Sequence, residues 1–403
     1  MRDRKRGKEA GTTPGSRHRR SWIILGVILI AAVALRVVFL TELTGKPDFD
    51  APVSDAQYND FWARGIATGQ WDQPKGNPDP LIPSTPYFRP PGYPHFLALI
   101  YMMSGGSYLA PRIAQALLGL IGILLAFFLG RSVFGRATGL VAAAMAAAYW
   151  GLIYFEGELQ PPALLVVLVL SLLLLLHRWA VRKTLLPVAV AGVVFGATAL
   201  VRPNVLLLLP VLLGWFWWVA VRSGLKRRLP ITAAAFVVCT VLVIAPASLR
   251  NLSVAGDFVP ISSNGGINLY IGNNTHTSLV TPRIPDIERL AGVSGWNLFR
   301  YPLIVEGVAK HEGRAMKHSE VSGYFSERAV DFISANPGTA LGYAFKRGLL
   351  LWGPNEVSNN KVLGEERRRS PVLRMLLTFP IVMALFVLGL GLWVLDWRRL
   401  RHL

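Results

Sequence analysis

A short acidic stretch just outside the first apolar run offers the first candidate for chemistry. It reads SDAQYNDFWARGIATG at residues 54–69 and contains Asp55, Tyr58 and Asp60. A carboxylate held beside a hydroxyl or an amine can remove its proton during nucleophilic attack. Asp55 is a candidate acid of this kind, and Tyr58 is a candidate for contact with a bound molecule. On spacing alone, however, the position of Asp55 at the start of a predicted helix favours a structural acid, which the helix dipole stabilises.

A second pair of acids, Glu156 and Glu158, lies in FEGELQPP between two apolar runs. Water is scarce at such a position, and an ionisable residue there is a candidate functional group. The acids of DFD at 48–50 could form a metal-binding D-x-D, but a solvated loop explains them better. The histidines His276, His311 and His318 are scattered along the chain. We therefore expect neither a metal nor another cofactor.

Four arginines are candidates for binding a phosphate group, because the guanidinium fork matches phosphate oxygens. They are placed at or near the predicted outer ends of apolar runs: Arg36, Arg89, Arg202 and Arg250. The alternative for an arginine near the end of a span is that it reaches out to the lipid headgroups. Asn273 and Asn274 could hydrogen-bond to hydroxyl groups of a bound molecule, or they could simply form a turn.

The composition indicates a membrane protein. Of the 403 residues, 52% are hydrophobic and 16% are charged, and the mean hydropathy is +0.42. The apolar residues gather in runs close to the roughly 20 residues that cross a bilayer. We predict an all-α, multi-pass membrane protein with about eight spans, at 22–40, 112–130, 137–155, 160–177, 184–201, 204–221, 229–249 and 372–395.

Basic segments between the apolar runs give the expected topology. RSVFGR, HRWAVRK, RSGLKRR and DWRRLRHL fall on the same side as the basic N-terminus if there are eight spans. Positive residues are retained in the cytoplasm, so both termini are expected there. The same clustering explains the net charge of +19 without nucleic acid. We expect four parts. A basic tail at 1–21 precedes a transmembrane module at 22–249, which includes the first outer loop at 41–111. A second outer region follows at 250–371, and the last span with its basic tail occupies 372–403.

The outer segments carry further local signals. The apolar segment 93–105 is too short to cross a bilayer and is expected to lie at the outer interface. Prolines between 74 and 94 predict an extended loop. In the second outer region, FVPISSNGGINLYIG predicts a β-hairpin with a turn at Asn264-Gly265. Together with helices near 319–335 and 338–351, this hairpin would give a small α+β region.

The stretch 54–69 itself predicts a short amphipathic helix at the membrane interface. Ser54 and Gln57 have the spacing of a capping box, and Gly69 can end the helix. Asp60 and Arg64 are four residues apart, in the order that favours an ion pair on one face. The other face is apolar and consists of Tyr58, Phe61, Trp62 and Ile66.

Taken in order along the chain, these segments resemble the GT-C glycosyltransferases, the membrane group that contains protein O-mannosyltransferases and lipid A aminoarabinose transferases. The resemblance rests on D-x-x-Y at 55–58 followed by ARGIATG, on RPPGYPHFLALIYMMSG at 89–105, and on a span ending in LGRSVFGR. LVRPNVLLLLP, RNLSVAGDFVPISSNGGINLYIGNN and FKRGLLLWGPNEVSNN are similar to a bacterial branch. Many members of the group have eleven or more spans and a folded C-terminal outer domain, whereas we predict about eight spans here. This difference concerns the part that binds the acceptor more than the part that binds the donor.

The resemblance implies a hexosyl or pentosyl transferase that takes sugar from a polyprenyl-phosphate carrier. The acceptor would be a lipid, a glycan or a protein at the outer, periplasmic face of a bacterial inner membrane. It further implies that Asp55 is the base and that Glu158 or Glu156 is the second acid. The reaction would invert the anomeric carbon, and arginines would stabilise the leaving phosphate.

Two other classes of function compete with this interpretation. A transporter or lipid flippase would place charged groups near the bilayer midplane, whereas the acids here lie at one face. A scaffold protein whose outer segments bind a partner would explain the loops. It would not explain why acids and arginines gather at the same membrane edge.

Overall fold

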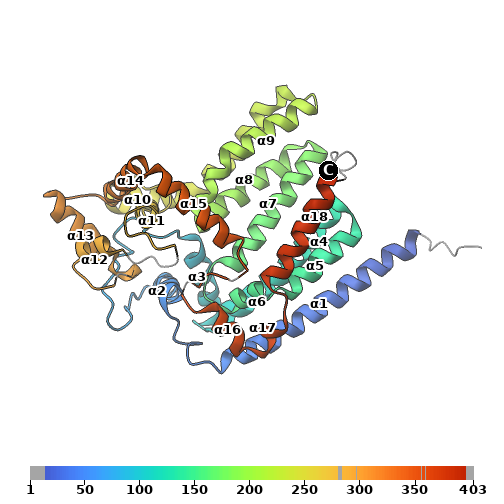
Figure 1. Ribbon diagram of the computed structural model, residues 1–403, viewed down its shortest axis with the longest axis horizontal. Helices are drawn as coiled ribbons and strands as arrows, with labels where there is room; N and C mark the ends of the chain where they lie inside the picture. The colour runs from blue at the N-terminus through green and yellow to red at the C-terminus, as the bar shows by residue number, and fades with distance from the viewer. Residues whose placement is uncertain (1–13, 280–283, 296, 355, 359, 396–403) are drawn as a thin grey trace, which may run out of the picture.

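The computed structural model describes residues 14–279, 284–295, 297–354, 356–358 and 360–395. Within these residues the chain is built from helices, and the one β-bridge is isolated (Figure 1). Five helical segments are long and apolar enough to cross a membrane, and three shorter ones are apolar. The all-α, multi-pass fold is therefore confirmed. The long segments are α1 (Pro14–Thr44), α4 (Leu109–Phe134), α7 (Pro162–Arg182), η1 with α9 (Pro203–Leu208 and Leu209–Arg222) and α10 (Leu229–Ala255); the shorter ones are α5 (Arg136–Ala148), α8 (Leu185–Val201) and α18 (Phe379–Leu395).

Each of the eight predicted spans coincides with an apolar helix, with two differences. The third span is interrupted after α5, because Tyr149 is extended and forms a parallel bridge with Leu377. The chain then continues as α6 (Trp150–Gly157). The last span begins at Phe379 rather than 372, since 371–375 form the separate helix α17 (Pro371–Met375). Much of the two predicted basic tails, at 1–13 and 396–403, lies outside the described residues.

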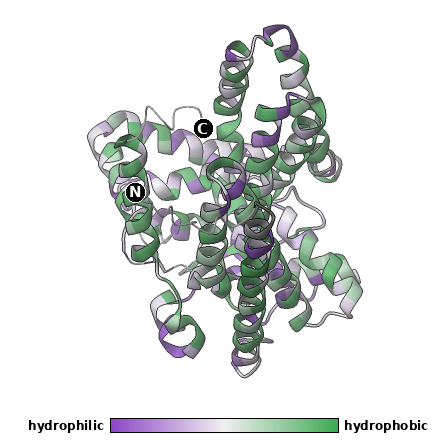
Figure 2. Cartoon of the chain, turned by 90° about the vertical axis from the view of Figure 1, so that its right-hand side faces the viewer, coloured by the Kyte–Doolittle hydropathy of each residue, from purple (hydrophilic) through white to green (hydrophobic). Residues whose placement is uncertain are grey.

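The surface of the bundle suits a lipid environment. Between 17% and 28% of the most apolar window of each long span is buried inside the protein, so most residues of these windows keep some exposed surface. Figure 2 shows hydrophobic residues along most of the long helices, with hydrophilic residues concentrated toward helix ends and connecting segments. A helix satisfies its backbone hydrogen bonds internally, which allows its apolar side chains to contact lipid directly.

The first outer loop contributes α2 (Ser54–Thr68) and α3 (Gly92–Ser104), so both predicted helices are confirmed. Gly69 ends α2 in the left-handed conformation with φ of 76°. The predicted capping box is wrong. Val53 is the N-cap and has no side-chain cap bond, and Ser54 has a φ of 54°. The proline-rich segment between the two helices consists of turns and extended chain, as predicted.

The helix α2 packs against protein on two faces. Its aromatic face, with Tyr58, Phe61 and Trp62, packs against Phe299 of the second outer region and Ile82 of the proline-rich loop. Its opposite face contributes Ala56 and Ala63 to a core shared with α3. The apolar pattern that indicated a lipid-facing stripe is therefore a protein core.

The second outer region is helical, and the predicted hairpin is wrong. The segment after Asn264 forms α11 (Gly265–Gly272), which packs closely on α14 (His318–Ala335). Gly266 permits this contact, because a Cβ there would lie 1.7 Å from the carbonyl oxygen of Ser322. The two predicted helices are confirmed as α14 and α15 (Pro337–Leu351). The remaining elements are α12 (Pro285–Ala291), η3 (Leu298–Arg300), α13 (Tyr301–Glu312) and α16 (Leu363–Arg369).

The helix α15 presents its apolar side outward. Leu341, Phe345 and Leu349 are 71%, 68% and 57% exposed and follow one helical face, while the Arg347 side chain turns inward to the carbonyl of Gly272. Trp352, directly after the helix, stacks on Phe386 of α18 with ring centroids 5.9 Å apart. The outward face is thus continuous with the shorter apolar helix α18, and an outward apolar face of this kind is typical of a helix lying in the membrane interface.

This arrangement predicts that Phe345 contacts lipid. A spin label at residue 345, in a Cys239→Ala background in nanodiscs, should be more accessible to oxygen than to an aqueous nickel complex. A label replacing Glu327, which is exposed on α14, should show the reverse. Equal nickel accessibility at the two positions would contradict the placement of α15 against lipid.

Candidate functional site

Asp55 lies in the first turn of α2 and forms an ion pair with Arg89. The distance from Asp55 Oδ1 to Arg89 Nη1 is 2.8 Å, and the two side chains are 27% and 25% exposed. Arg89 precedes the Pro-Pro-Gly turn that opens α3. Because the pair is partly open to solvent, both groups can exchange their mutual contact for contacts with a ligand.

Arg202 lies beside this pair. It follows the last residue of α8, and its backbone N–H donates to the carbonyl of Thr198 at 2.7 Å. Its charge interacts with those of both Arg89 and Asp55. Two of the four arginines predicted to bind phosphate therefore gather at the predicted base.

Glu158 lies in the turn between α6 and α7 and pairs with Lys361. The Lys361 ammonium is 2.7 Å from Glu158 Oε1 and 2.5 Å from Asp48 Oδ2. Burial alone would lower the pKa of Lys361, but the two carboxylates reverse this effect and raise it. Asp48, predicted to be a solvated loop residue, is instead part of this charged group, and the same ammonium lowers its pKa against the opposing effect of burial.

The turn that carries Glu158 is held by buried polar side chains from other elements. Arg112 of α4 donates to the carbonyl of Gly157 at 2.9 Å. Gln115 donates to the carbonyls of Glu156 and Glu158 at 2.9 and 2.8 Å. Asn59, one helical turn after Asp55 on α2, donates to the carbonyl of Leu159 at 3.0 Å. These bonds bring the turn and the start of α2 to the same end of the bundle.

Glu156 is separated from this group and pairs with Arg36 inside the bundle. The distance between Glu156 Oε1 and Arg36 Nη2 is 2.6 Å, and both side chains are 4% exposed. Gly119 of α4 makes room for the carboxylate, since a Cβ there would lie 2.0 Å from Glu156 Oε1. Arg36 was predicted to bind phosphate, but the structure places it in a buried ion pair with no exposed surface for a ligand.

Asp60 and Arg64 form the predicted ion pair, at 3.0 Å, but within a larger network. The hydroxyl groups of Tyr101 and Tyr108 donate to the Asp60 carboxylate at 2.5 and 3.3 Å. The Arg64 guanidinium lies over both tyrosine rings. Burial, followed by the Asp60 charge, raises the pKa of Tyr101, so this hydroxyl stays protonated and donates. The network borders a cavity of about 600 Å³ that Gln57, Asp50 and Asp72 also line.

Arg250 supports the proline-rich loop through its guanidinium group. It donates to the carbonyls of Ile82, Thr85 and Pro83 and lies over the ring of Tyr87. Asn251 is fully buried and accepts from the backbone of Tyr87 at 3.0 Å. The structure therefore gives Arg250 a structural position, where phosphate binding was predicted.

Tyr58, Asn273 and Asn274 also take part in internal contacts. Tyr58 is 2% exposed and packs edge-on against Trp62 and Phe299. The side chain of Asn273 donates to Leu269, and that of Asn274, which is 2% exposed, donates to Tyr270. The predicted contacts of these residues with a substrate would require rearrangement.

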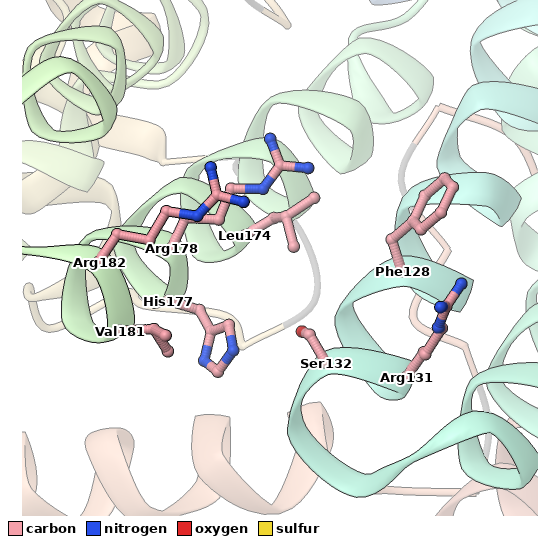
Figure 3. A pocket seen from close by; sticks show the side chains of 8 residues that line it. All are labelled: Phe128, Arg131, Ser132, Leu174, His177, Arg178, Val181 and Arg182. Carbon is pink, nitrogen blue, oxygen red and sulfur yellow. The ribbon is translucent and has the colours of Figure 1, made fainter. Parts of the chain in front are cut away.

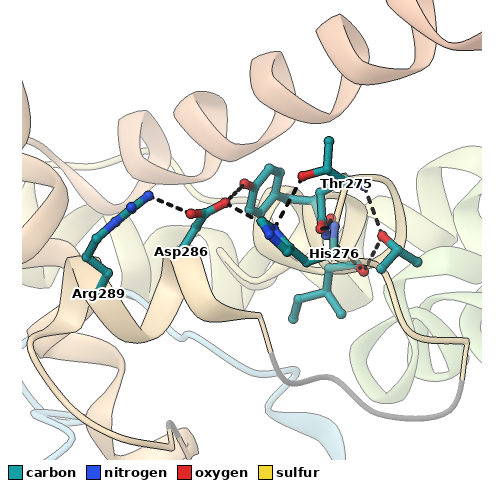
Figure 4. A network of polar contacts seen from close by, with 8 residues as sticks. Thr275, His276, Asp286 and Arg289 are labelled. Atoms are coloured by element: carbon teal, nitrogen blue, oxygen red, sulfur yellow. Dashed lines mark hydrogen bonds and ion pairs between the residues drawn. The ribbon is translucent and has the colours of Figure 1, made fainter.

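A polar network fixes the segment after Asn274. The Tyr270 hydroxyl donates to Asp286 at 2.9 Å, and Arg289 pairs with the same carboxylate at 2.5 Å. Figure 4 shows His276 and Thr275 beside these groups. Burial and the Asp286 carboxylate raise the pKa of Tyr270 to about 12. Within the described residues, no group of three His, Cys, Asp or Glu side chains is arranged to hold a metal ion.

Sequence reasoning missed Lys361, Arg112 and Gln115. Lys361 is about 200 residues from Glu158 in the chain, and nothing in its local sequence indicates that partner. Arg112 and Gln115 lie within the predicted second span. The rarity of polar residues there was the available signal, and it would have identified both.

The fold and these contacts define a helical membrane protein in which Asp55, Glu158 and their basic partners lie at one end of the bundle. The model of the family "Dolichyl-phosphate-mannose-protein mannosyltransferase" matches residues 88–247. This match confirms the resemblance to GT-C glycosyltransferases for that part of the chain. No curated protein gave a significant match.

Two solved structures are similar to the chain at low identity. One is the apo crystal structure of the Archaeoglobus fulgidus oligosaccharyltransferase, with 13% identity, a TM-score of 0.43, and coverage of 81% of this chain and 35% of the other. The second is the oligosaccharyltransferase AglB from the same organism in complex with an inhibitory peptide and a dolichol-phosphate, with 16% identity, a TM-score of 0.41, and coverage of 74% and 37%. The chain spans about a third of the length of these structures.

The structural role that we assign to the Arg36–Glu156 pair can be tested by measuring stability. Arg36→Met leaves the Glu156 carboxylate buried without a counter-charge, and we expect it to destabilise the fold by about 3–5 kcal/mol. Arg36→Met combined with Glu156→Gln should recover most of this loss. Denaturant unfolding in detergent measures both variants. Equal stability of the single and double variants would contradict the assigned pairing.

Proposed function

We propose that the protein is a membrane glycosyltransferase that moves a sugar from a polyprenyl-phosphate carrier to an acceptor at the outer face of the membrane. The observation that carries the proposal is the Asp55–Arg89 pair with Arg202 beside it. The family match over 88–247 includes Arg89 and Arg202 and adds support. The family name contains a dolichyl-phosphate sugar, which is the donor chemistry that we propose here.

Asp55 is the general base in this proposal. An acceptor hydroxyl or amine attacks the anomeric carbon, its proton passes to the Asp55 carboxylate, and the bond between sugar and lipid phosphate breaks. Arg89 contacts Oδ1 of Asp55, so Oδ2 is the oxygen that we assign to the proton. A single displacement of this kind inverts the anomeric configuration, and the configuration of the product can be read by NMR.

Arg89 and Arg202 stabilise the leaving lipid phosphate. The guanidinium of Arg89 has five N–H donors in a planar fork, and it uses Nη1 for Asp55. Its other donors can face a phosphate, which would hold the base and the leaving group on neighbouring sites. Preorganised donors of this kind act on charge as it develops in the transition state.

Glu158 is the second acid of the proposed site. It lies in the turn that Asn59 ties to α2, and Lys361 and Asp48 accompany it. We propose that this group borders the acceptor or the sugar, and that Lys361 keeps the two carboxylates together without a metal. Glu156 and Arg36 stay outside the site and maintain the bundle.

The proposed orientation places this end of the bundle in the periplasm. It rests on the basic segments that follow α4 and α7, which lie at the other ends of those helices and would be cytoplasmic. Cysteine labelling of an exposed residue such as Asp79→Cys should then succeed from the outer side only.

Asp55→Asn should lower turnover by about 10²–10⁴, because the amide cannot accept the acceptor's proton. The measurement is transfer from polyprenyl-phosphate sugars by purified protein in nanodiscs. Asp331→Asn removes an exposed carboxylate on α14 and serves as the matched control, with activity unchanged. Full turnover by the Asp55→Asn variant would show that the base is elsewhere.

Arg89→Gln should reduce kcat by about 10²–10³, the usual effect of removing one preorganised donor at a developing anion. Arg289→Gln, on an arginine that is 79% exposed, is the control and should leave kcat unchanged. If Arg89→Gln weakens only acceptor binding, Arg89 does not serve the leaving phosphate.

A further inference from the structure

A basic cavity lies between α4 and α7, at the ends of these helices farthest from Asp55. It has a volume of about 250 Å³, and its lining includes the side chains of Arg131, His177, Arg178 and Arg182. Figure 3 shows these side chains around a common space, with Phe128 and Ser132 on one helix and Leu174 and Val181 on the other. Among the residues that the structure describes, no carboxylate lines the cavity.

The spacing of the lining residues explains why they converge. Phe128, Arg131 and Ser132 follow one face of α4. Leu174, His177, Arg178, Val181 and Arg182 follow one face of α7, at intervals of three, four, seven and eight residues. The two helices pack along each other, so the two faces meet near their C-terminal ends.

The charge of the cavity is unbalanced. Within the described part of the chain, none of the three arginines forms an ion pair; Arg131 lies over the ring of Trp22. Like charges repel more strongly beside low-dielectric walls than in water. An anion with several oxygens would remove this repulsion and would match the guanidinium forks.

More general effects explain each arginine singly but not their convergence. A basic residue in the last turn of a helix is stabilised by the helix dipole, and basic residues are common on the cytoplasmic side. Neither effect requires arginines from two helices to share a cavity. The apolar part of the lining, with Phe128, Leu174 and Val181, also distinguishes this site from one for a free ion.

We propose that this cavity binds the phosphate headgroup of an anionic phospholipid in the leaflet opposite the Asp55 site. The arginines contact the phosphate, and the apolar lining contacts the glycerol and the upper acyl chains. From Leu109 to Phe134, α4 is about 39 Å long at 1.5 Å per residue, so its two ends lie in opposite headgroup regions. Basic cavities between spans on this side suit anionic headgroups.

The test compares lipid binding by purified full-length variants in detergent. Arg178→Gln/Arg182→Gln removes two charges from exposed positions of α7, so the fold should persist. Arg131→Gln removes one charge from α4. The matched control is Arg227→Gln/Arg228→Gln, two exposed arginines in another basic segment expected on the same side. Native mass spectrometry counts bound phosphatidylglycerol against phosphatidylcholine, and thermal unfolding measures stabilisation by each lipid.

We expect phosphatidylglycerol to bind the wild type and the control variant and to raise their Tm more than phosphatidylcholine does. Binding to Arg178→Gln/Arg182→Gln should be about 30-fold weaker, with a smaller loss for Arg131→Gln. Unchanged binding by the cavity variants would overturn the proposal, as would an equal loss in the control, which would indicate diffuse attraction. Equal stabilisation by inorganic phosphate would assign the cavity to a soluble anion and overturn the lipid assignment.

Discussion

The turn between α6 and α7 must have its backbone carbonyls hydrogen-bonded, because it is buried at the edge of an apolar bundle. An unpaired carbonyl there would cost about 1–3 kcal/mol. Arg112 and Gln115 of α4 and Asn59 of α2 supply the donors. This requirement connects the long spans to the first outer loop, since the same turn cannot be satisfied without both helices in place.

The position of α2 follows from this constraint. Asn59 fixes one side of the helix to the turn, and Phe299 of the second outer region packs on its aromatic side. Asp55, one turn before Asn59, is therefore held at the edge of the core where the chain is still partly exposed. Arg250 and Asn251 at the end of α10 fix the proline-rich loop that leads to Arg89. Different contacts therefore position the proposed base and its arginine: α2 is held by the turn and by Phe299, and the loop before Arg89 is held by the end of α10.

The sequence predicted the parts that depend on local composition and failed where packing between distant segments decides. The spans, α2, α3, α14 and α15 follow from apolar periodicity and helix signals, although the third predicted span is interrupted at Tyr149 and the last begins at Phe379 rather than 372. The predicted hairpin with its turn at 264–265 was wrong. Gly266 instead allows α11 to pack closely against Ser322 of α14, and the local sequence does not distinguish this use of glycine from a turn. Asp55 and Arg89 were both identified, but their contact was not, since the rest of α2 and the whole proline-rich loop lie between them in the chain. Arg36 and Arg250 were predicted to bind phosphate together with Arg89, because the local sequence does not reveal the partners that they contact on other elements.

The charge pairs themselves suggest which of these acids can do chemistry. Each of four acids at this end of the bundle has a basic partner: Asp55 with Arg89, Asp60 with Arg64, Glu156 with Arg36 and Glu158 with Lys361. A buried pair resists exchange, because separating it leaves an uncompensated charge in a low-dielectric region. The carboxylates of Asp60, Glu156 and Glu158 are 10% exposed or less, whereas that of Asp55 is 27% exposed. Among these four pairs, Asp55 and Arg89 can therefore exchange their mutual contact for contacts with a substrate at the lowest cost. This difference in exposure, rather than charge alone, distinguishes Asp55 from Asp60, Glu156 and Glu158.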